Sequence, residues 1–163
     1  MNREELIKQR DKIQAELDRL TELINKPVGR WEPNGGDYYY FVDEAGNEMR
    51  NEWQLSPSDV FRFQSGNCFK SYQEAIDYKK NLITKQRLKD LALELNNNVE
   101  PNWKNINQLK YYIYLNPKTH GLAQSFITTN EDVGIYCLDD KLLQIAKQRI
   151  GEERIIKLIK SGV

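Results

Sequence analysis

Apolar residues recur at alternating intervals of three and four along residues 2–25, the spacing of the a and d positions of a coiled coil. The charges around this row are mixed in sign, and Asn25-Lys26-Pro27 ends the pattern because proline cannot continue a helix. Arg10 interrupts the row and suits an antiparallel pair, in which it meets an acidic residue of the other chain. The row consists of Leu6, Arg10, Ile13, Leu17, Leu20 and Ile24.

An isolated helix of this length is marginal in water, so the apolar row is expected to pack against a partner. One alternative is that the helix packs on its own domain. The other is that it pairs with a second copy of the chain, and the charged flanks together with Pro27 favour this alternative. The pattern therefore predicts an oligomerising helix over residues 1–26 and a homo-oligomer, in the simplest case a dimer.

Residues 38–42, Tyr-Tyr-Tyr-Phe-Val, have the aromatic enrichment of a β-strand. Alternation places Tyr39 and Phe41 on one face and the other three side chains on the opposite face. Because both faces are aromatic, we expect this strand to be central in its sheet. Gly46-Asn47 predicts a hairpin turn with a return strand over residues 48–53.

After the hairpin the pattern becomes irregular and then helical. Residues 55–59 are expected to be an irregular segment, residues 60–63 a third strand, and residues 67–69 a short fourth strand. Ser71 and Glu74 form the capping box of a helix that runs over residues 72–95. Three asparagines at 96–98 end that helix, because asparagine tolerates left-handed backbone geometry.

The second half of the chain repeats this order in a weaker form. Trp103 and the run 111–114 echo Trp31 and the earlier tyrosine run. The pattern predicts a turn at 116–121, a strand at 123–129, and a segment at 134–137 equivalent to the one before the first helix. A helix capped by Asp139 or Asp140 then extends to residue 150, and Gly151 separates it from a last helical turn at 152–159.

These patterns predict an α+β protein with a coiled-coil-like N-terminal helix and two tandem units, each a small antiparallel sheet backed by a helix. The expected boundaries are residues 1–26 for the helix, 27–97 for the first unit and 98–163 for the second.

Composition narrows the class of protein. Lys plus Arg and Asp plus Glu both total 24, so no net field attracts long nucleic acid or an anionic membrane. The N-terminus is charged, and no apolar run approaches the ~18 residues that a membrane span requires. Cys68 and Cys137 suit buried thiols in a reducing compartment, although their comparable positions also allow a disulfide. We therefore expect a soluble, cytoplasmic protein with no membrane partner.

The sequence offers little catalytic chemistry. His120, the single histidine, lies in a predicted turn, and a pairing with either cysteine has no local signature. No metal-binding spacing is present, and Asp139-Asp140 and Glu152-Glu153 are explained by their places at helix starts. Gly35-Gly36 would offer backbone N–H groups to a phosphate, but a plain turn explains it better. We expect no enzyme, no cofactor and no metal.

The predicted aromatic sheet is the main candidate binding surface. One face would stack on bases or on a partner while nearby arginines pair with phosphate, unless both faces are covered by the helix and the companion unit. The balanced charge favours a small nucleotide over long nucleic acid. The candidate residues are Trp31, Tyr39, Phe41, Arg50 and Arg62.

The order of these motifs resembles a family of small accessory proteins of phages and prophages of low-GC Gram-positive bacteria. The resemblance rests on the leading helix, on Trp31 with the run 38–41, on residues 66–71 with Glu74-Ala75, and on later motifs. These later motifs are Trp103, the run Lys110-Tyr111-Tyr112-Ile113 and the terminal Gly151-Glu152-Glu153-Arg154.

The resemblance implies a phage origin and carries over no catalytic residue. It implies a non-enzymatic counter-defence protein that blocks a host defence effector, such as a CRISPR nuclease, or sequesters a nucleotide signal. The alternative is a nucleic-acid-binding accessory factor for phage replication or recombination.

Overall fold

The computed structural model describes residues 3–25, 30–128 and 134–162 and divides into two compact units, residues 1–34 and 35–163. The chain is α+β, with two small antiparallel sheets, as predicted. Within the described residues, no helix combines the length and the apolar character that crossing a bilayer requires.

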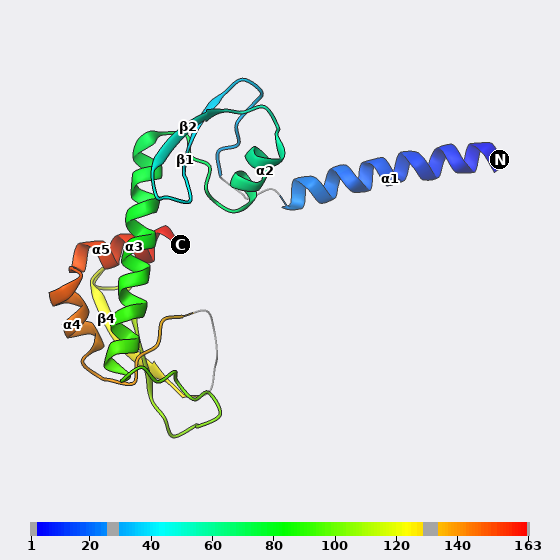
Figure 1. Cartoon of the computed structure of the whole chain (residues 1–163). Helices are drawn as coiled ribbons and strands as arrows, with labels where there is room; N and C mark the ends of the chain where they lie inside the picture. The colour runs from blue at the N-terminus through cyan, green and yellow to red at the C-terminus, as the bar shows by residue number, and fades with distance from the viewer. Residues whose placement is uncertain (1–2, 26–29, 129–133, 163) are drawn as a thin grey trace. The chain divides into compact units, whose positions relative to one another are not determined.

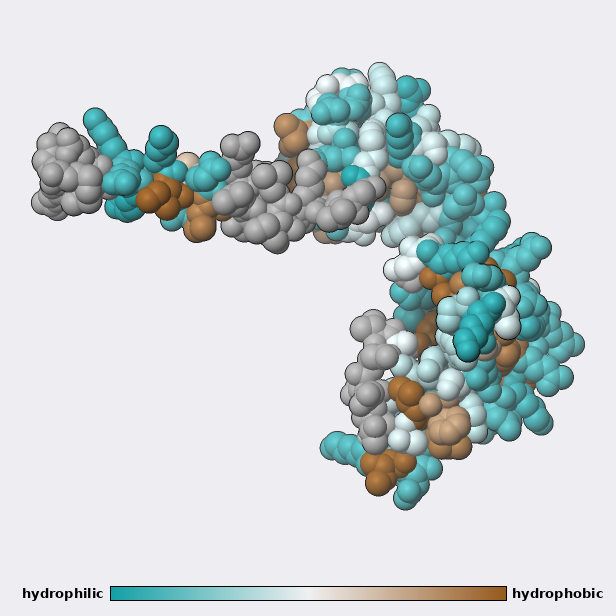
Figure 2. Space-filling model, turned by 180° about the vertical axis from the view of Figure 1, so that it is seen from behind, coloured by the Kyte–Doolittle hydropathy of each residue, from teal (hydrophilic) through white to brown (hydrophobic). Residues whose placement is uncertain are grey.

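The first unit contains helix α1, Arg3–Asn25, which agrees with the helix predicted from the apolar row. All described side chains from residue 7 to residue 18 are exposed, including Ile13 at 62% and Leu17 at 56%. Figure 2 shows hydrophobic side chains at the surface of α1. The side chains of Leu6, Leu20 and Ile24 lie outside the described part of the structure.

In the second unit, β1 (Tyr38–Val42) pairs with β2 (Glu48–Glu52) in an antiparallel hairpin. The opposite edge of β1 is also occupied. Tyr40 and Phe69 exchange two backbone hydrogen bonds of 2.9 Å, and the Asn67 side chain donates to the Val42 carbonyl at 2.6 Å. Residues 67–69 form an isolated bridge and not the predicted fourth strand, so among the described residues β1 belongs to a two-stranded sheet. The predicted central position of this strand was therefore wrong.

Residues 57–64 form a helix, α2 (Pro57–Gln64), so the predicted strand at 60–63 was wrong. The predicted irregular segment at 55–59 is irregular only at residues 55 and 56. Ser56 is the N-cap, and its hydroxyl accepts the Asp59 N–H at 3.2 Å while the Asp59 carboxylate accepts the Ser56 N–H at 3.0 Å. Pro57 at the first helical position favours this start because it needs no hydrogen bond there. The strand was inferred from the aromatic alternation of residues 61 and 63, which the capping box overrides.

Helix α3, Tyr72–Leu95, has the predicted bounds and the predicted capping box between Ser71 and Glu74. It ends where Asn97 and Asn98 adopt positive φ values of 55° and 61°. These are the left-handed conformations that asparagine tolerates better than most residues.

The next hairpin joins β3 (Lys110–Leu115) and β4 (Leu122–Ile127). The strand predicted over 123–129 overlaps β4, and Thr129 lies outside the described residues. Tyr111 exchanges two backbone hydrogen bonds with Cys137, in the same way that Tyr40 does with Phe69. Helix α4 (Leu142–Arg149) follows. Its N-cap residue is Lys141, which makes no side-chain capping hydrogen bond, so the predicted cap by Asp139 or Asp140 was wrong. Asp139 instead accepts the Lys141 N–H in the turn before the helix.

Gly151 separates α4 from α5 (Glu152–Ser161), as the sequence predicts. Its φ of 101° and ψ of 132° are open almost only to glycine. The bend lets α5 pack on α3 and on α4.

Helix α3 connects two hydrophobic cores. Its first part packs on β1 and β2, whereas its second part packs with α4 and α5 (Figure 1). The predicted boundary at residues 97 and 98 therefore does not separate two bodies, and residues 35–163 form one unit. The larger core consists of Leu88, Leu91, Ala92, Leu122, Cys137, Leu142, Ala146, Ile150, Ile155 and Leu158.

Candidate functional site

The predicted binding residues of the first sheet lie mostly in its core. Tyr39 is 0% exposed and Phe41 is 8% exposed, so neither ring offers a face for stacking on a ligand. Tyr39 packs edge-on against Trp53, with ring centroids 5.7 Å apart. The exposed face of β1 carries Tyr38, whose ring is covered by the Arg50 guanidinium at 3.9 Å. The alternation of side chains along β1 was predicted correctly. However, the face that carries Tyr39 and Phe41, which we predicted to be the binding surface, is the buried one.

Trp31 is half-buried and belongs to the first unit, whereas the other four predicted residues belong to the second. Arg62, on α2, stacks its guanidinium 3.9 Å from the centre of the Phe41 ring and donates to the Tyr39 hydroxyl at 2.8 Å. Both arginines are therefore engaged with aromatic rings of the sheet. A phosphate would have to compete with these contacts.

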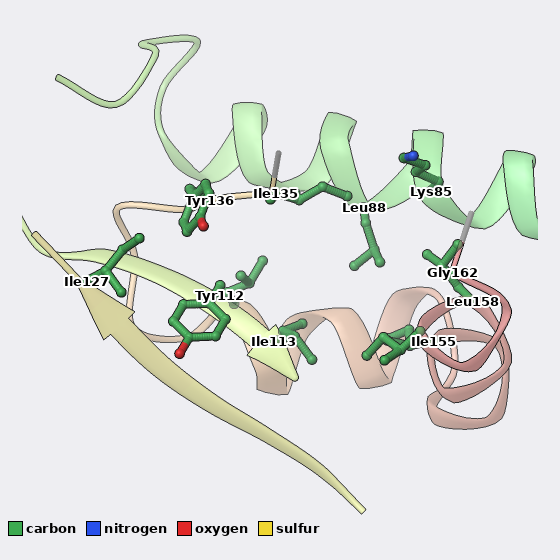
Figure 3. Close-up of a pocket in the computed structure, with 13 residues that line it drawn as sticks. Lys85, Leu88, Tyr112, Ile113, Ile127, Ile135, Tyr136, Ile155, Leu158 and Gly162 are labelled. Carbon is green, nitrogen blue, oxygen red and sulfur yellow. The ribbon is translucent and has the colours of Figure 1, made fainter. Parts of the chain in front are cut away.

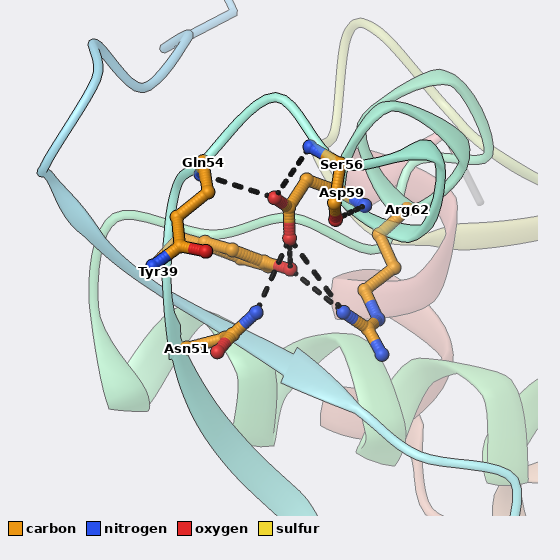
Figure 4. Close-up of polar contacts among 6 residues, drawn as sticks. All are labelled: Tyr39, Asn51, Gln54, Ser56, Asp59 and Arg62. Carbon is orange, nitrogen blue, oxygen red and sulfur yellow. Dashed lines mark hydrogen bonds and ion pairs between the residues drawn. The ribbon is translucent and has the colours of Figure 1, made fainter.

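A buried carboxylate, Asp59, holds α2 against the sheet (Figure 4). The side chain is 1% exposed and accepts four hydrogen bonds besides lying 3.8 Å from Arg62. The donors are the Tyr39 hydroxyl at 2.7 Å, the Asn51 amide at 3.2 Å, the Gln54 N–H at 3.1 Å and the Ser56 N–H at 3.0 Å. Because its oxygens are satisfied by the protein, Asp59 is a structural anchor and not a catalytic base.

The hydrogen bonds control the ionisation of this carboxyl. Burial opposes the charge on Asp59, but the bonds from Tyr39, Ser56 and Gln54 outweigh burial and lower its pKa from 3.8 to about 2. Burial also raises the pKa of the Tyr39 phenol, which thus stays protonated and able to donate.

The stability of the protein is expected to depend on this pKa at low pH. A carboxyl whose pKa is lower in the folded than in the unfolded state contributes stability above about pH 4, which is lost as the pH falls through about 2. Between pH 4 and pH 2 the free energy of unfolding of the wild type should fall more steeply than that of Asp59→Asn, as urea unfolding followed by tryptophan fluorescence would measure. Asp140→Asn, at an exposed aspartate, should keep the wild-type slope. Equal slopes for the wild type and Asp59→Asn would contradict the assignment.

A positively charged groove lies between α3 and α5, with a volume of about 740 Å³. Residues seven apart on α3 and three apart on α5 fall on one side of each helix, so cations from both helices line the same groove. The cations are Lys80, Arg87, Arg154, Lys157 and Lys160, all of them exposed.

Two carboxylates, Asp77 and Glu153, also line the groove and leave a local excess of three positive charges. Among the described residues, the surface ion pairs involve other cations, such as Lys79 with Glu48 at 2.9 Å and Lys147 with Glu152 at 2.9 Å. No ion pair within the described part of the chain neutralises any of the five groove cations. Their charges are therefore available to an anionic partner.

Sequence reasoning missed this groove because its two halves are far apart along the chain. The available signal was the spacing of Lys80 and Arg87, and that of Arg154, Lys157 and Lys160, on the polar sides of two helices. On a single helix such spacing indicates only a solvated face. The packing of α5 on α3 is what brings the two sets together.

The other candidate residues remain dispersed. His120 has a φ of 55° in the exposed turn before β4. Cys68 and Cys137 are both buried, and within the described residues they form no disulfide. Burial raises the pKa of the Cys137 thiol. Over the ranges that the structure describes, no three metal-ligating side chains form a group that would hold an ion.

Comparisons with models of protein families, with curated proteins and with solved structures gave no match. The resemblance to phage accessory proteins therefore stays a prediction, and the basic groove between α3 and α5 is the candidate site that the geometry provides.

Proposed function

We propose that this protein is a non-enzymatic binding protein that docks an acidic surface of a partner protein into the basic groove. The observation that carries the proposal is the set of five groove cations that no ion pair neutralises within the described residues. Such an electrostatic surface accelerates association and selects an oppositely charged partner.

The lining of the groove favours a protein over a nucleotide. Ile83 is 45% exposed there, and no aromatic ring belongs to the lining. Sites for bases usually stack them on aromatic side chains, whereas cations around an apolar residue suit an acidic segment with an apolar anchor. Of the two modes of counter-defence, blocking a protein effector is thus better supported than sequestering a nucleotide signal.

The biological setting comes from the resemblance to phage accessory proteins. In that setting the partner is a host defence effector in the host cytoplasm, such as a CRISPR nuclease, whose function is blocked by occupation of its surface. We further propose that α1 pairs as a coiled coil in a homodimer, because Ile13 and Leu17 of the apolar row are exposed in the single chain. A dimer would present two grooves.

We also propose that residues 35–163 arose from two tandem units. The support is the shared order of a hairpin, a two-bond bridge and a helix, with the bridge formed by Phe69 in the first case and by Cys137 in the second. The likeness ends at α3, whose second half packs in the second core.

Reversing two groove charges in R154E/K157E tests the proposed function. The wild type, expressed in a Gram-positive host whose CRISPR nuclease targets a phage, is expected to restore plaque formation. The variant should restore it about 100-fold less well, because two attractive contacts become repulsive. The control K104E/K118E carries the same change in net charge at exposed lysines outside the groove and should act as the wild type does.

Two results would contradict the proposal. If the wild type restores no plaques against any defence system tested, the counter-defence role is excluded. If R154E/K157E equals the control, the groove is not the binding surface. Anisotropy with purified protein at low salt separates the alternatives: a labelled poly-glutamate should bind through the groove, whereas tighter binding of a single-stranded oligonucleotide would favour the accessory factor in replication or recombination.

A further inference from the structure

A second concave site is lined by α3, α5 and the second sheet (Figure 3). Its volume is about 420 Å³, within the range of about 300–1,000 Å³ that is usual for small-molecule sites. Leu88 from α3, Ile113 from β3 and Ile155 and Leu158 from α5 point into it. Most of its wall is aliphatic, contributed by α3, β3, β4, α5 and the segment before α4.

The wall is not closed off from water. Ile113, Ile127, Ile135 and Ile159 are each only partly buried although they line the cavity. Apolar surface left in contact with water is unfavourable by roughly 25 cal/mol per Å², so filling the site with an apolar body would be favourable. This distinguishes it from the packed core beside it, where Ala146 is 0% exposed.

The polar groups of the site are few, and one of them is charged. Lys85, half-buried on α3, lies toward the end of the cavity near Leu158 and Gly162, while the rings of Tyr112 and Tyr136 lie toward the other end (Figure 3). Among the described residues, no carboxylate belongs to the lining and Lys85 forms no ion pair. An ammonium beside an aliphatic wall attracts an anion that carries an apolar tail.

We propose that this cavity binds a medium-chain aliphatic carboxylate, with the carboxylate on Lys85 and the chain along the partly exposed Ile113, Ile127 and Ile135. A volume of about 420 Å³ has room for a flexible chain of about ten carbons. A single cation matches a monoanion better than it matches a phosphate with two charges. The aliphatic wall favours a flexible alkyl chain over a flat aromatic ring.

This site is distinct from the basic groove, although α3 and α5 contribute to both. Ile155, Leu158 and Ile159 of α5 line the cavity, and Arg154, Lys157 and Lys160 of the same helix line the groove. The proposal therefore goes beyond the proposed function, and the failure of one does not imply the failure of the other.

Isothermal titration calorimetry of the full-length protein with decanoate, below the concentration at which it forms micelles, tests the proposal. The wild type should bind decanoate with submillimolar affinity. Lys85→Gln, which keeps most of the side chain and removes the charge, should weaken decanoate about five- to tenfold and leave the neutral probe decanol unchanged. Lys89→Gln, one helical turn further along α3 and exposed, is the matched control and should bind decanoate as the wild type does.

A second variant tests the cavity by volume. Ile135→Trp adds an indole at a partly buried wall position, so it should weaken decanoate and decanol alike by more than tenfold while the circular dichroism spectrum and melting temperature stay close to those of the wild type. The proposal is overturned if the wild type binds neither probe, or if Lys85→Gln and Lys89→Gln bind decanoate equally well. Binding that survives in a folded Ile135→Trp variant would place the ligand elsewhere and also overturn it.

Discussion

Replacing Asp59 with alanine is expected to lower the free energy of unfolding of residues 35–163 by about 3–5 kcal/mol. The carboxylate is 1% exposed, and its removal leaves the Tyr39 hydroxyl and the N–H groups of Gln54 and Ser56 without their acceptor. Each buried donor left unpaired costs about 1–3 kcal/mol. Arg62 also loses the negative charge 3.8 Å away.

Urea unfolding followed by tryptophan fluorescence measures this loss, because Trp53 packs against Tyr39 and reports on the same core. Asp59→Asn provides an intermediate case, because its amide keeps one oxygen acceptor but directs an N–H donor at other donors. The loss in the free energy of unfolding should therefore be smaller than for alanine. Asp140→Ala, at an exposed aspartate, should stay within about 0.5 kcal/mol of the wild type. If Asp59→Ala were as stable as Asp140→Ala, the network would not hold α2 in place.

The elements that sequence reasoning located correctly are those with a local physical cause. The bounds of β1 follow from a run of β-enriched residues that stops at the Asp43 turn, where the Asp43 carboxylate accepts the Asn47 N–H at 2.7 Å. The bounds of α3 follow from the capping box at Ser71 and from asparagines in left-handed conformations. Each of these signals spans only a few residues, so no tertiary contact is needed to interpret it.

The prediction for residues 57–64 failed because the capping box that indicates helix α2 was given less weight than the aromatic residues that follow it. Ser56 and Asp59 have the spacing of a capping box, with Pro57 at a position that favours a helix start. The aromatic residues that follow suggested a strand instead. The decisive factor is the burial of Asp59: the same carboxylate caps the helix and accepts a hydrogen bond from Tyr39 on β1, which ties α2 to the sheet.

The candidate sites were the least predictable part of the molecule. The aromatic side chains of β1 were found, but burial decides which face of a strand is available, and burial depends on α2 and α3. The groove joins cations from two helices that are distant in sequence, and its character arises because α5 folds back after Gly151. A balanced total of 24 acidic and 24 basic residues gave no indication of a local excess of charge.

The triple replacement I13A/L17A/L20A is expected to raise the dissociation constant of the proposed α1 dimer by about 1,000-fold or more. Two of these side chains are 62% and 56% exposed in the single chain, so pairing is what would bury them. Each truncation removes about 2 kcal/mol of favourable burial, and a dimer contains six of them. Even if only a third of this total is realised, the dimer loses about 4 kcal/mol of association free energy. This loss corresponds to a dissociation constant raised by about 1,000-fold. Native mass spectrometry across a dilution series measures the masses of the species and their concentration dependence.

Alanine has the highest helix propensity, so the truncations do not weaken α1 itself, and a changed mass would report on the apolar row. The control K8A/K12A/D18A makes three replacements on the same helix at exposed positions outside the row and should keep the wild-type mass. Arg10, which contacts its neighbour Asp11 at 2.6 Å in the single chain, would be free to exchange that weak exposed pair for an acidic residue of a second chain. A wild type that is monomeric at micromolar concentration, or a triple variant with the wild-type mass, would show that the row serves a different contact. The exposure of Ile13 and Leu17 on a helix that is marginal alone is the observation that supports the proposed pairing.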